Sequence, residues 1–480
     1  MTPDEYESHD AIGLAERVQS GEVHPSELLD AALARAADHN PTLNAIVIDM
    51  EKQARSAIEA GLPDGPLRGV PFLLKDLHLL YEGERSTNGS VLFRDNVADH
   101  DSELVKRYKR AGLVIFGKSA SPEFGVTATT ESALHGVTRN PWNLERSAGG
   151  SSGGASSAIS GGILPAANAS DGGGSIRIPA SCCGLFGLKP TRGRTPFGPD
   201  AGEGWSGMSC MHAITRSVRD SAALLDATQG PDVGAPYIAP PPKRPYLEEV
   251  GAAPGRLRIA LQKQPWNAAE IHPDCIAGVE DAAKLLQDLG HDVEEAPLEI
   301  DFSILGPATS VIMSANLRAM VDERLQRLGR ELQDDDLELI TRSIYDSSPK
   351  HTAADYARAV RTIHAVGRTV AGHLEHYDLI VSPTMAAPPL PLGAISLSNE
   401  DRASYGRDIL STVGFTQLFN ASGNPAASIP LWWNDDGLPI GIQLAARFGD
   451  EATLFRISAQ LEEARPWFAQ RPSMLQNGAA

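Results

Sequence analysis

Three short segments contain the residue types that cleavage of an amide or ester bond requires. Lys75 ends the apolar run 69–74, Ser151 and Ser152 stand in a Gly-Gly-Ser-Ser-Gly-Gly segment, and Ser175 follows three glycines. A serine hydroxyl is a weak nucleophile until a base removes its proton. A lysine amine is such a base only when it is neutral, and burial favours the neutral form. The three segments are therefore candidates for nucleophilic catalysis.

Two of these segments lie in a stretch rich in glycine, serine and alanine, residues 140–194. Such a composition is typical of a flexible linker. Apolar segments interrupt the stretch at 159–166 and 176–180, however. Small residues also allow backbones to approach one another closely. The stretch therefore predicts a tightly packed centre of the fold.

The elements that must position these segments follow the alternation of helices and buried strands that is typical of α/β proteins. Apolar spacing and glycine stops give the boundaries. Helices are expected over 11–18, 26–37, 101–110, 272–289 and most of 303–364, and strands over 69–74, 113–116, 257–261 and 291–295. The strand, helix and strand that begin at 257 predict a βαβ unit.

Composition narrows the class of protein. The formal net charge of −19 makes nucleic acid and anionic lipid poor partners, because like charges repel. The cysteines at 182, 183, 210 and 275 have no metal or redox spacing and favour a reducing compartment. The acidic N-terminus has no signal-peptide pattern, and no apolar run is expected to span a membrane. We therefore expect a cytoplasmic protein without a metal site.

Taken together, the segments resemble the amidase signature family. The matching parts, in the order of the family, are 139–143, 149–154, 173–177, 187–194, 420–426 and 437–443. Each glycine-rich part alone is weak evidence, but the joint match is specific and covers nearly the whole chain. Within the family, residues 140–143 and 192–199 are most similar to the branch that includes hydrolases of the 6-aminohexanoate cyclic dimer.

This resemblance implies a role for each candidate residue. Ser175 is the nucleophile, Ser151 the bridging serine and Lys75 the base, and Ser152 is a second serine that could share the bridging role. The resemblance also implies a cis peptide bond between Gly150 and Ser151. The mechanism needs no metal and no organic cofactor.

The loop before Ser175 is expected to stabilise the oxyanion that develops during acyl transfer. Gly172, Gly173 and Gly174 can offer backbone N–H groups with no side chain in the way. Asp171 and Arg177 flank the loop. They are expected to pair and to hold its shape, because an unpaired buried charge is rare.

Two other interpretations of the residues remain open. Residues 149–153 also match the G-x-S-x-G pattern of α/β-hydrolases, in which Ser151 itself would attack. The histidines available as its partners are His272, His291 and His351. A non-catalytic binding module is the other interpretation, because glycine-rich loops also bind phosphate. Neither interpretation explains Lys75 together with residues 173–177.

The implied fold is a single large α/β domain with a mixed, twisted central sheet covered by helices. Its expected parts are an N-terminal helical region (1–66), the signature core (67–230), a proline-rich connection (231–256) and a second α/β part (257–480). The pocket is expected to be lined by the helical stretch 304–317. The implied substrate is a small linear or cyclic amide, with aryl amides, esters and carbamates as further candidates. A homodimer through the N-terminal helices is the one protein partner considered.

Overall fold

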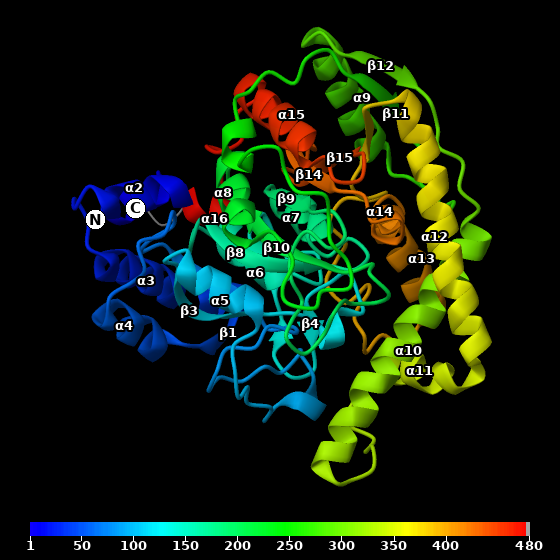
Figure 1. Ribbon diagram of the computed structural model, residues 1–480, viewed down its shortest axis with the longest axis horizontal. Coiled ribbons are helices and arrows are strands. Elements are labelled where there is room, and N and C mark those ends of the chain that lie inside the picture. Colours follow the sequence, from blue (N-terminus) through cyan, green and yellow to red (C-terminus); the bar gives the residue numbers. More distant parts are fainter. Residues whose placement is uncertain (477–480) are drawn as a thin grey trace.

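A mixed sheet of eight strands forms the centre of the computed structural model, which describes residues 1–476 (Figure 1). Its strands are β8 (Ala166–Asp171), β9 (Phe186–Lys189), β10 (Cys210–Thr215), β11 (Arg258–Leu261), β12 (Asp292–Glu295), β13 (Leu379–Pro383), β14 (Ala426–Trp433) and β15 (Pro439–Ala446). They lie in the order β12-β11-β13-β15-β14-β9-β10-β8. Strand β11 is parallel to β12 and β13, and the other neighbours are antiparallel.

Strands of this sheet are apolar on both faces, because helices cover both. In β13, Leu379 and Val381 pack into one buried cluster, whereas Ile380 between them packs into another on the opposite face. Side chains alternate across a strand, so a sheet covered on both sides requires a continuous apolar run. The expected mixed α/β sheet covered by helices is confirmed.

A second sheet carries the first candidate residue. It has three strands in the order β1-β3-β2, with bounds β1 (Ile46–Asp49), β2 (Pro71–Lys75) and β3 (Val114–Ser119). Strand β2 also contacts β8 at the edge of the large sheet, and the backbone N–H of Lys75 donates to Asn168 Oδ1 on β8 at 3.1 Å. Lys75 therefore lies where the two sheets meet.

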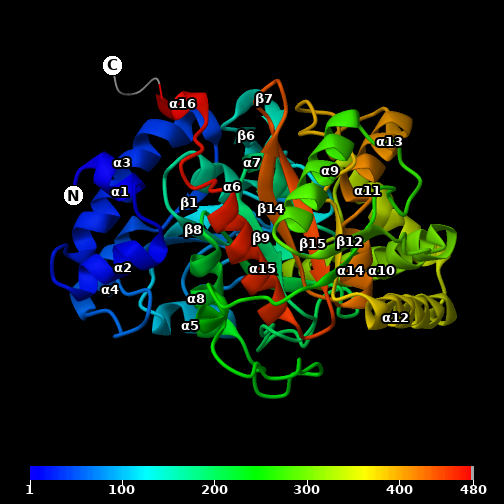
Figure 2. The same ribbon diagram turned by 90° about the horizontal axis from the view of Figure 1, so that it is seen from above.

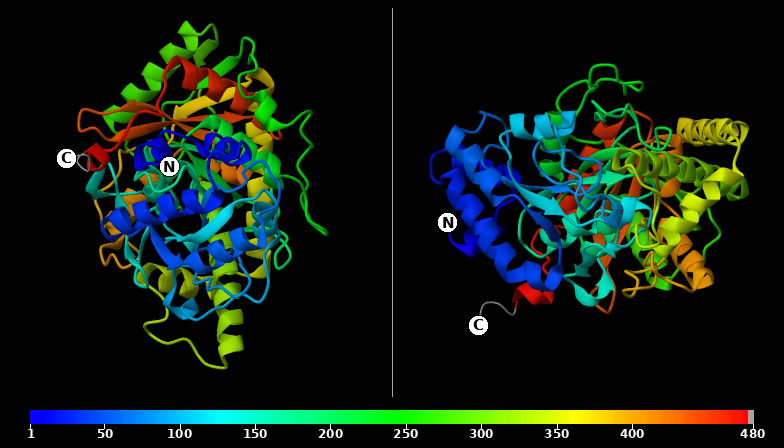
Figure 3. Two further views of the ribbon diagram at one scale, coloured as in Figure 1. Left: turned by 90° about the vertical axis from the view of Figure 1, so that its left-hand side faces the viewer. Right: turned by 90° about the horizontal axis from the view of Figure 1, so that it is seen from below.

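Helices surround the sheets and gather at two opposite ends. Figure 2 and Figure 3 show α1 to α4 at one end and α10 to α12 at the other. The helices are α1 (Pro3–Glu7), α2 (Ala11–Gln19), α3 (Pro25–Leu43), α4 (Glu51–Ala60), α5 (Glu103–Arg110), α6 (Gly153–Ser160), α7 (Arg177–Cys183), α8 (Val218–Thr228), α9 (Pro273–Asp288), α10 (Phe302–Leu328), α11 (Leu339–Ser347), α12 (Ala353–His376), α13 (Arg402–Val413), α14 (Gln417–Ser422), α15 (Glu451–Ala464) and α16 (Ser473–Gln476). Two short hairpins, β4 (Glu131–Ser132) with β5 (Gly136–Val137) and β6 (Arg139–Asn140) with β7 (Asn143–Ser147), precede α6.

The predicted βαβ unit is confirmed as β11, α9 and β12, with the two strands parallel. The large sheet contains strands from before and after the proline-rich connection in the sequence. Strands β8 to β10 come from the signature core, and β11 to β15 come from the C-terminal part. The N-terminal region contributes a strand as well as helices, because β1 pairs with β3.

Helix α10 differs from one expectation. By length and composition alone it is apolar enough to cross a membrane, because an 18-residue window within it has a mean hydropathy of 1.2. In this fold Leu305 and Ile312 pack against the sheet and α12, and Val321 packs into a neighbouring cluster. These three apolar residues of α10 therefore lie in the core of the protein, whereas Ile304 and Leu328 of the same helix are exposed.

Candidate active site

Lys75 is fully buried at the end of a strand whose residues are all buried. Desolvation by this burial lowers the pKa of Lys75 to about 7 from its ordinary value of 10.5, although the carboxylate of Asp171 favours the charged form. Removal from water disfavours the charged form of a group unless a partner of opposite charge is close. The amine is therefore poised to be neutral near neutral pH.

Three serine hydroxyls surround the Lys75 amine. Nζ lies 2.7 Å from Ser151 Oγ, 3.0 Å from Ser152 Oγ and 3.0 Å from Ser170 Oγ. The hydroxyl of Ser152 donates its own proton to the carbonyl of Ser170 at 3.2 Å, so its oxygen can only accept from the amine. Ser152 is thus an anchor for Lys75, whereas the Ser151 hydroxyl donates to no other group within residues 1–476 and its proton stays available.

The glycines around Ser151 are required by close packing. The peptide bond between Gly150 and Ser151 is cis, as the resemblance implied. A side chain on Gly150 would overlap the backbone of Thr129, and a methyl group on Gly125 would lie 3.0 Å from Ser151 Oγ. Ser151 itself is only 2% exposed. The glycine-rich stretch is therefore the packed centre that its apolar interruptions predicted, not a linker.

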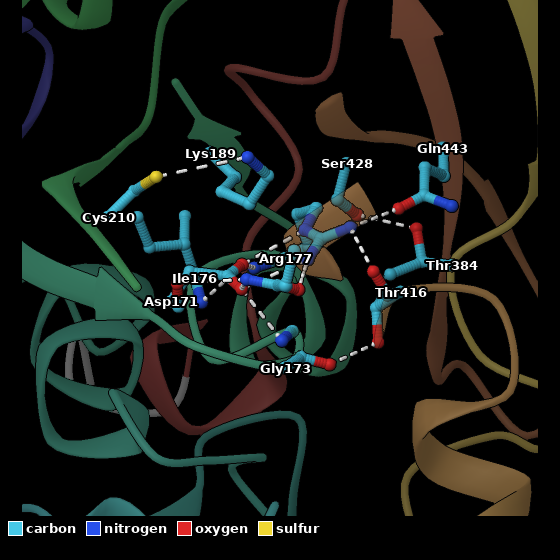
Figure 4. A network of polar contacts seen from close by, with 12 residues as sticks. Asp171, Gly173, Ile176, Arg177, Lys189, Cys210, Thr384, Thr416, Ser428 and Gln443 are labelled. Atoms are coloured by element: carbon cyan, nitrogen blue, oxygen red, sulfur yellow. Dashed lines mark hydrogen bonds and ion pairs between the residues drawn. The ribbon is translucent and has the colours of Figure 1, made fainter. Parts of the chain in front are cut away.

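Asp171 and Arg177 form a fully buried ion pair. Arg177 Nε lies 2.9 Å from Asp171 Oδ2, and both side chains have no exposed area. Burial raises the pKa of Asp171, but the attraction of the Arg177 guanidinium outweighs it and holds this pKa well below its usual range. Figure 4 shows the guanidinium at the centre of a network. Its other acceptors are Gln443 Oε1 at 2.8 Å, the Thr416 carbonyl at 2.9 Å and Asn420 Oδ1 at 2.6 Å.

The loop from β8 to α7 brings Ser175 to the same region, because it begins directly after Ser170 and Asp171. Ser175 is partly exposed, as are Gly172 and Gly173, whereas Gly174 is buried. Among residues 1–476, the Ser175 hydroxyl makes no hydrogen bond. A nucleophile needs this combination of access to a substrate and a hydroxyl that is not already engaged.

One expected oxyanion donor is already engaged. The backbone N–H of Gly174 donates to Asp171 Oδ1 at 2.7 Å, so it is not free for a ligand. Within the described part of the chain, the amides of Gly172, Gly173 and Ser175 have no acceptor. The free donors therefore lie on either side of Gly174, whose own N–H holds the loop to Asp171 in this structure. The role of Gly174 as an oxyanion donor stays a prediction.

The histidines proposed as alternative partners of Ser151 lie elsewhere. His272 caps α9 by accepting the N–H of Asp274 at 3.2 Å, and His291 contacts Gln460 at 2.9 Å. His351 is exposed in a turn before α12. Since Lys75 is the ionisable partner of Ser151, the geometry disfavours a Ser-His-Asp site.

Several polar residues of the site were not singled out by sequence reasoning. Ser170 contacts the Lys75 amine, Asn168 binds its backbone, and Thr416, Asn420 and Gln443 bind the Asp171–Arg177 pair. A signal existed for some of them. Polar residues inside buried strands, such as Asn168 in β8 and Gln443 in β15, need a specific partner.

Known proteins resemble this chain over nearly its whole length. The family model described as Amidase matches residues 27–455. A 6-aminohexanoate-cyclic-dimer hydrolase of Paenarthrobacter ureafaciens is 38% identical over 97% of this chain and 97% of its own. An acylamidase of Rhodococcus erythropolis is 34% identical over 96% of this chain and 97% of its own.

Solved structures agree with this result. A structure of 6-aminohexanoate cyclic dimer hydrolase superposes with a TM-score of 0.92 at 37% identity, covering 97% of this chain and 99% of that one. A bacterial aryl acylamidase of the amidase signature family superposes with a TM-score of 0.88 at 27% identity, over 97% of this chain and 99% of that one. The expected amidase signature fold is confirmed.

Proposed function

The chain belongs to the amidase family and is an amidohydrolase acting on carbon–nitrogen bonds, and on that premise we propose that it cleaves small linear or cyclic amides through Ser175, Ser151 and Lys75. The observation that carries the proposal is the buried Lys75 amine, with a pKa of about 7, at 2.7 Å from Ser151 Oγ. A neutral amine has two N–H groups and one lone pair. Ser152 and Ser170 can accept the two N–H groups, which leaves the lone pair for the proton of Ser151.

In the first half of the reaction Lys75 takes the proton of Ser151, and Ser151 takes the proton of Ser175. The Ser175 oxygen attacks the amide carbon, and the carbonyl electron pair moves to the oxygen. The resulting oxyanion accepts from free amides of the loop that precedes and includes Ser175. Loss of one such donor typically slows acyl transfer by about a hundredfold or more.

In the second half the carbon–nitrogen bond breaks. The leaving amine takes the proton that Lys75 holds, by way of Ser151, and Ser175 remains acylated. A water molecule then gives a proton to the same relay and attacks the ester carbon. The bond from this carbon to the Ser175 oxygen breaks, the acid leaves, and the relay returns the proton to the Ser175 oxygen. Every proton moves between these side chains, the substrate and water, so the mechanism uses neither a metal nor an organic cofactor.

The proposed substrates are small linear or cyclic amides, and aryl amides, esters and carbamates are further candidates. Relatives named 6-aminohexanoate-cyclic-dimer hydrolase and acylamidase support the amides among these candidates. Helix α10 is the proposed wall of the pocket. Its Thr309 accepts from Gln417 Nε2 at 3.1 Å, next to Thr416 of the site network, and this contact supports the assignment.

The test is labelling with a fluorophosphonate, followed by peptide mapping of the adduct by mass spectrometry. We expect an adduct on Ser175 in the wild type, and a loss of at least about 10⁴-fold in labelling rate in Lys75→Met, because triad members act as a unit. Lys118→Met is the matched control. Lys118 is also fully buried and its pKa is lowered to about 8 by burial, but it donates to the Leu79 carbonyl.

Three outcomes would count against the proposal. An adduct on Ser151 that forms equally fast with and without Lys75 would favour the Ser-His-Asp interpretation. Equal losses in Lys75→Met and Lys118→Met would indicate a general effect of removing a buried lysine. A folded wild type without any adduct would contradict serine catalysis. Hydrolysis rates for matched anilides, esters and carbamates would then rank the substrate classes.

A further inference from the structure

The peptide unit between Gly173 and Gly174 is held at both of its polar ends. The Gly173 carbonyl accepts from Thr416 Oγ1 at 2.7 Å, and the Gly174 N–H donates to Asp171 Oδ1 at 2.7 Å. Figure 4 shows Thr416 and Gly173 directed toward one another from separate segments. Because a peptide unit is planar, hydrogen bonds at its two ends fix the orientation of the whole plane.

Arg177 joins the two residues that hold this peptide. Its Nη1 donates to the Thr416 carbonyl at 2.9 Å, and its Nη2 donates to Asp171 Oδ1 at 2.9 Å. Thr416, Asp171 and Arg177 are all fully buried. The peptide, the two residues and the guanidinium therefore form a closed ring of hydrogen bonds, whose side chains are shielded from solvent and whose Gly173 is partly exposed.

The ring of hydrogen bonds requires a glycine at position 174. Gly174 has a φ of 138°, a conformation that favours glycine, and a methyl group there would overlap Thr416 Oγ1 and Ile178. The hydroxyl of Thr416 is therefore in contact with the backbone itself and has no side chain between. This direct contact lets a single hydroxyl control the direction of the loop.

The free amides lie on both sides of the fixed peptide. The N–H of Gly173 precedes it and the N–H of Ser175 follows it, and neither has an acceptor within residues 1–476. We propose that Thr416 is a positioning residue of the reaction, whose hydroxyl aims these two N–H groups at the developing oxyanion. This inference rests on the proposed acyl-transfer function.

The test compares variants of Thr416 in the full chain. Thr416→Val keeps the branched shape without the hydroxyl, and Thr416→Ser keeps the hydroxyl. Thr412→Val is the matched control, because the buried Thr412 hydroxyl also donates to a backbone carbonyl, that of Asp408 at 2.8 Å, outside the site. The readouts are the maximal rate of Ser175 labelling by a fluorophosphonate, the half-saturating concentration of the probe, and Tm.

We expect Thr416→Val to lower the maximal labelling rate by about tenfold, less than the loss of a whole oxyanion donor, with the half-saturating concentration within about twofold. Thr416→Ser should restore most of the rate, and Thr412→Val should not change it, whatever their Tm values. If Thr416→Val does not fold, Thr416→Cys replaces it, because a thiol is a weak donor of similar size.

A folded Thr416→Val or Thr416→Cys with the wild-type rate would overturn the inference, as would equal losses in Thr416→Ser or in Thr412→Val. These results leave the labelling of the wild type intact and thus the proposed function. A folded wild type that is not labelled at Ser175 would instead overturn the proposed function, and the role of Thr416 with it.

Discussion

Two buried clusters at the centre of the molecule treat their ionisable groups in opposite ways. Lys75 is surrounded by serine hydroxyls, and its pKa falls to about 7. Asp171 is buried to the same degree, yet pairing with Arg177 holds its pKa below the usual range and keeps the carboxylate charged. Burial penalises charge in both clusters, and the partner decides whether the group keeps it.

The difference corresponds to two tasks. A base must change its protonation state during each turnover, so neutral partners suit Lys75. A support must keep one geometry, so a charged pair with many hydrogen bonds suits Asp171 and Arg177. Because Ser170 and Asp171 are neighbours in β8, a single peptide bond connects the hydroxyl that contacts the Lys75 amine to the carboxylate of the charged pair.

The largest expected effect comes from breaking the charged cluster. Arg177→Met should lower the free energy of unfolding by about 3–5 kcal/mol, because it leaves the Asp171 carboxylate buried without its counter-ion. Urea denaturation followed by circular dichroism measures this. The control is Arg256→Met, which breaks an exposed pair with Asp292, 73% and 52% exposed, and should cost less than about 1 kcal/mol. Similar losses in the two variants would contradict the contrast.

Replacing the buried cation of the amine cluster by methionine should change the free energy of unfolding in the opposite direction. Lys75→Met should raise the free energy of unfolding at pH 7 by up to about 4 kcal/mol, since the variant has no proton to give up on folding. The folded pKa of about 7 lies below the ordinary value of 10.5. Wild-type stability is therefore lowest below pH 7 and rises toward pH 10.5. Urea titrations at pH 7 and pH 10 should show the gain shrinking at the higher pH; a constant gain would refute it.

The lowered pKa of Lys75 also predicts the pH dependence of the reaction. With a base of pKa about 7, the rate should rise by about tenfold from pH 6 to pH 8 and then level off, because only the neutral amine accepts a proton. The maximal rate of fluorophosphonate labelling, measured from pH 5.5 to 9, is the readout. A profile that is flat across this range would exclude Lys75 as the base.

The smallest effect tests how the amine is oriented. Ser170→Ala removes one of the three hydroxyls at the Lys75 amine, and a lost hydrogen bond of about 1 kcal/mol predicts a rate lowered by roughly fivefold. Ser157→Ala is the control, because the Ser157 hydroxyl donates to the Arg139 carbonyl at 2.7 Å, away from Lys75. If the two variants react equally fast, Ser170 does not orient the base.

The amine cluster was largely predictable from the sequence, because its signals are local. An apolar run before Lys75 indicates burial, and the glycines around Ser151 indicate close packing. The resemblance to a family then related Lys75, Ser151 and Ser175 to one another. The α/β class followed from the alternation of helices and apolar strands, but the order of strands in the large sheet did not.

The charged cluster was predictable only in its first contact. Asp171 and Arg177 are close in the sequence and were expected to pair. Thr416 and Gln443 follow Arg177 in the sequence by 239 and 266 residues. No local sequence pattern links either residue to Arg177. The sequence also gives no means to distinguish the backbone N–H groups of Gly172, Gly173 and Gly174. Only the position of the Asp171 carboxylate separates the engaged amide from the free ones.

The meeting of the two sheets has a consequence for the response of the protein to heat. Lys75 comes from the small sheet and Ser170 from the edge strand of the large one, and the two strands are joined there by side chains. A slight parting of the sheets would separate the amine from the hydroxyl while each sheet keeps its own ladder of hydrogen bonds. The activity of the enzyme therefore depends on how the two sheets are docked. On warming, activity should be lost at a lower temperature than secondary structure.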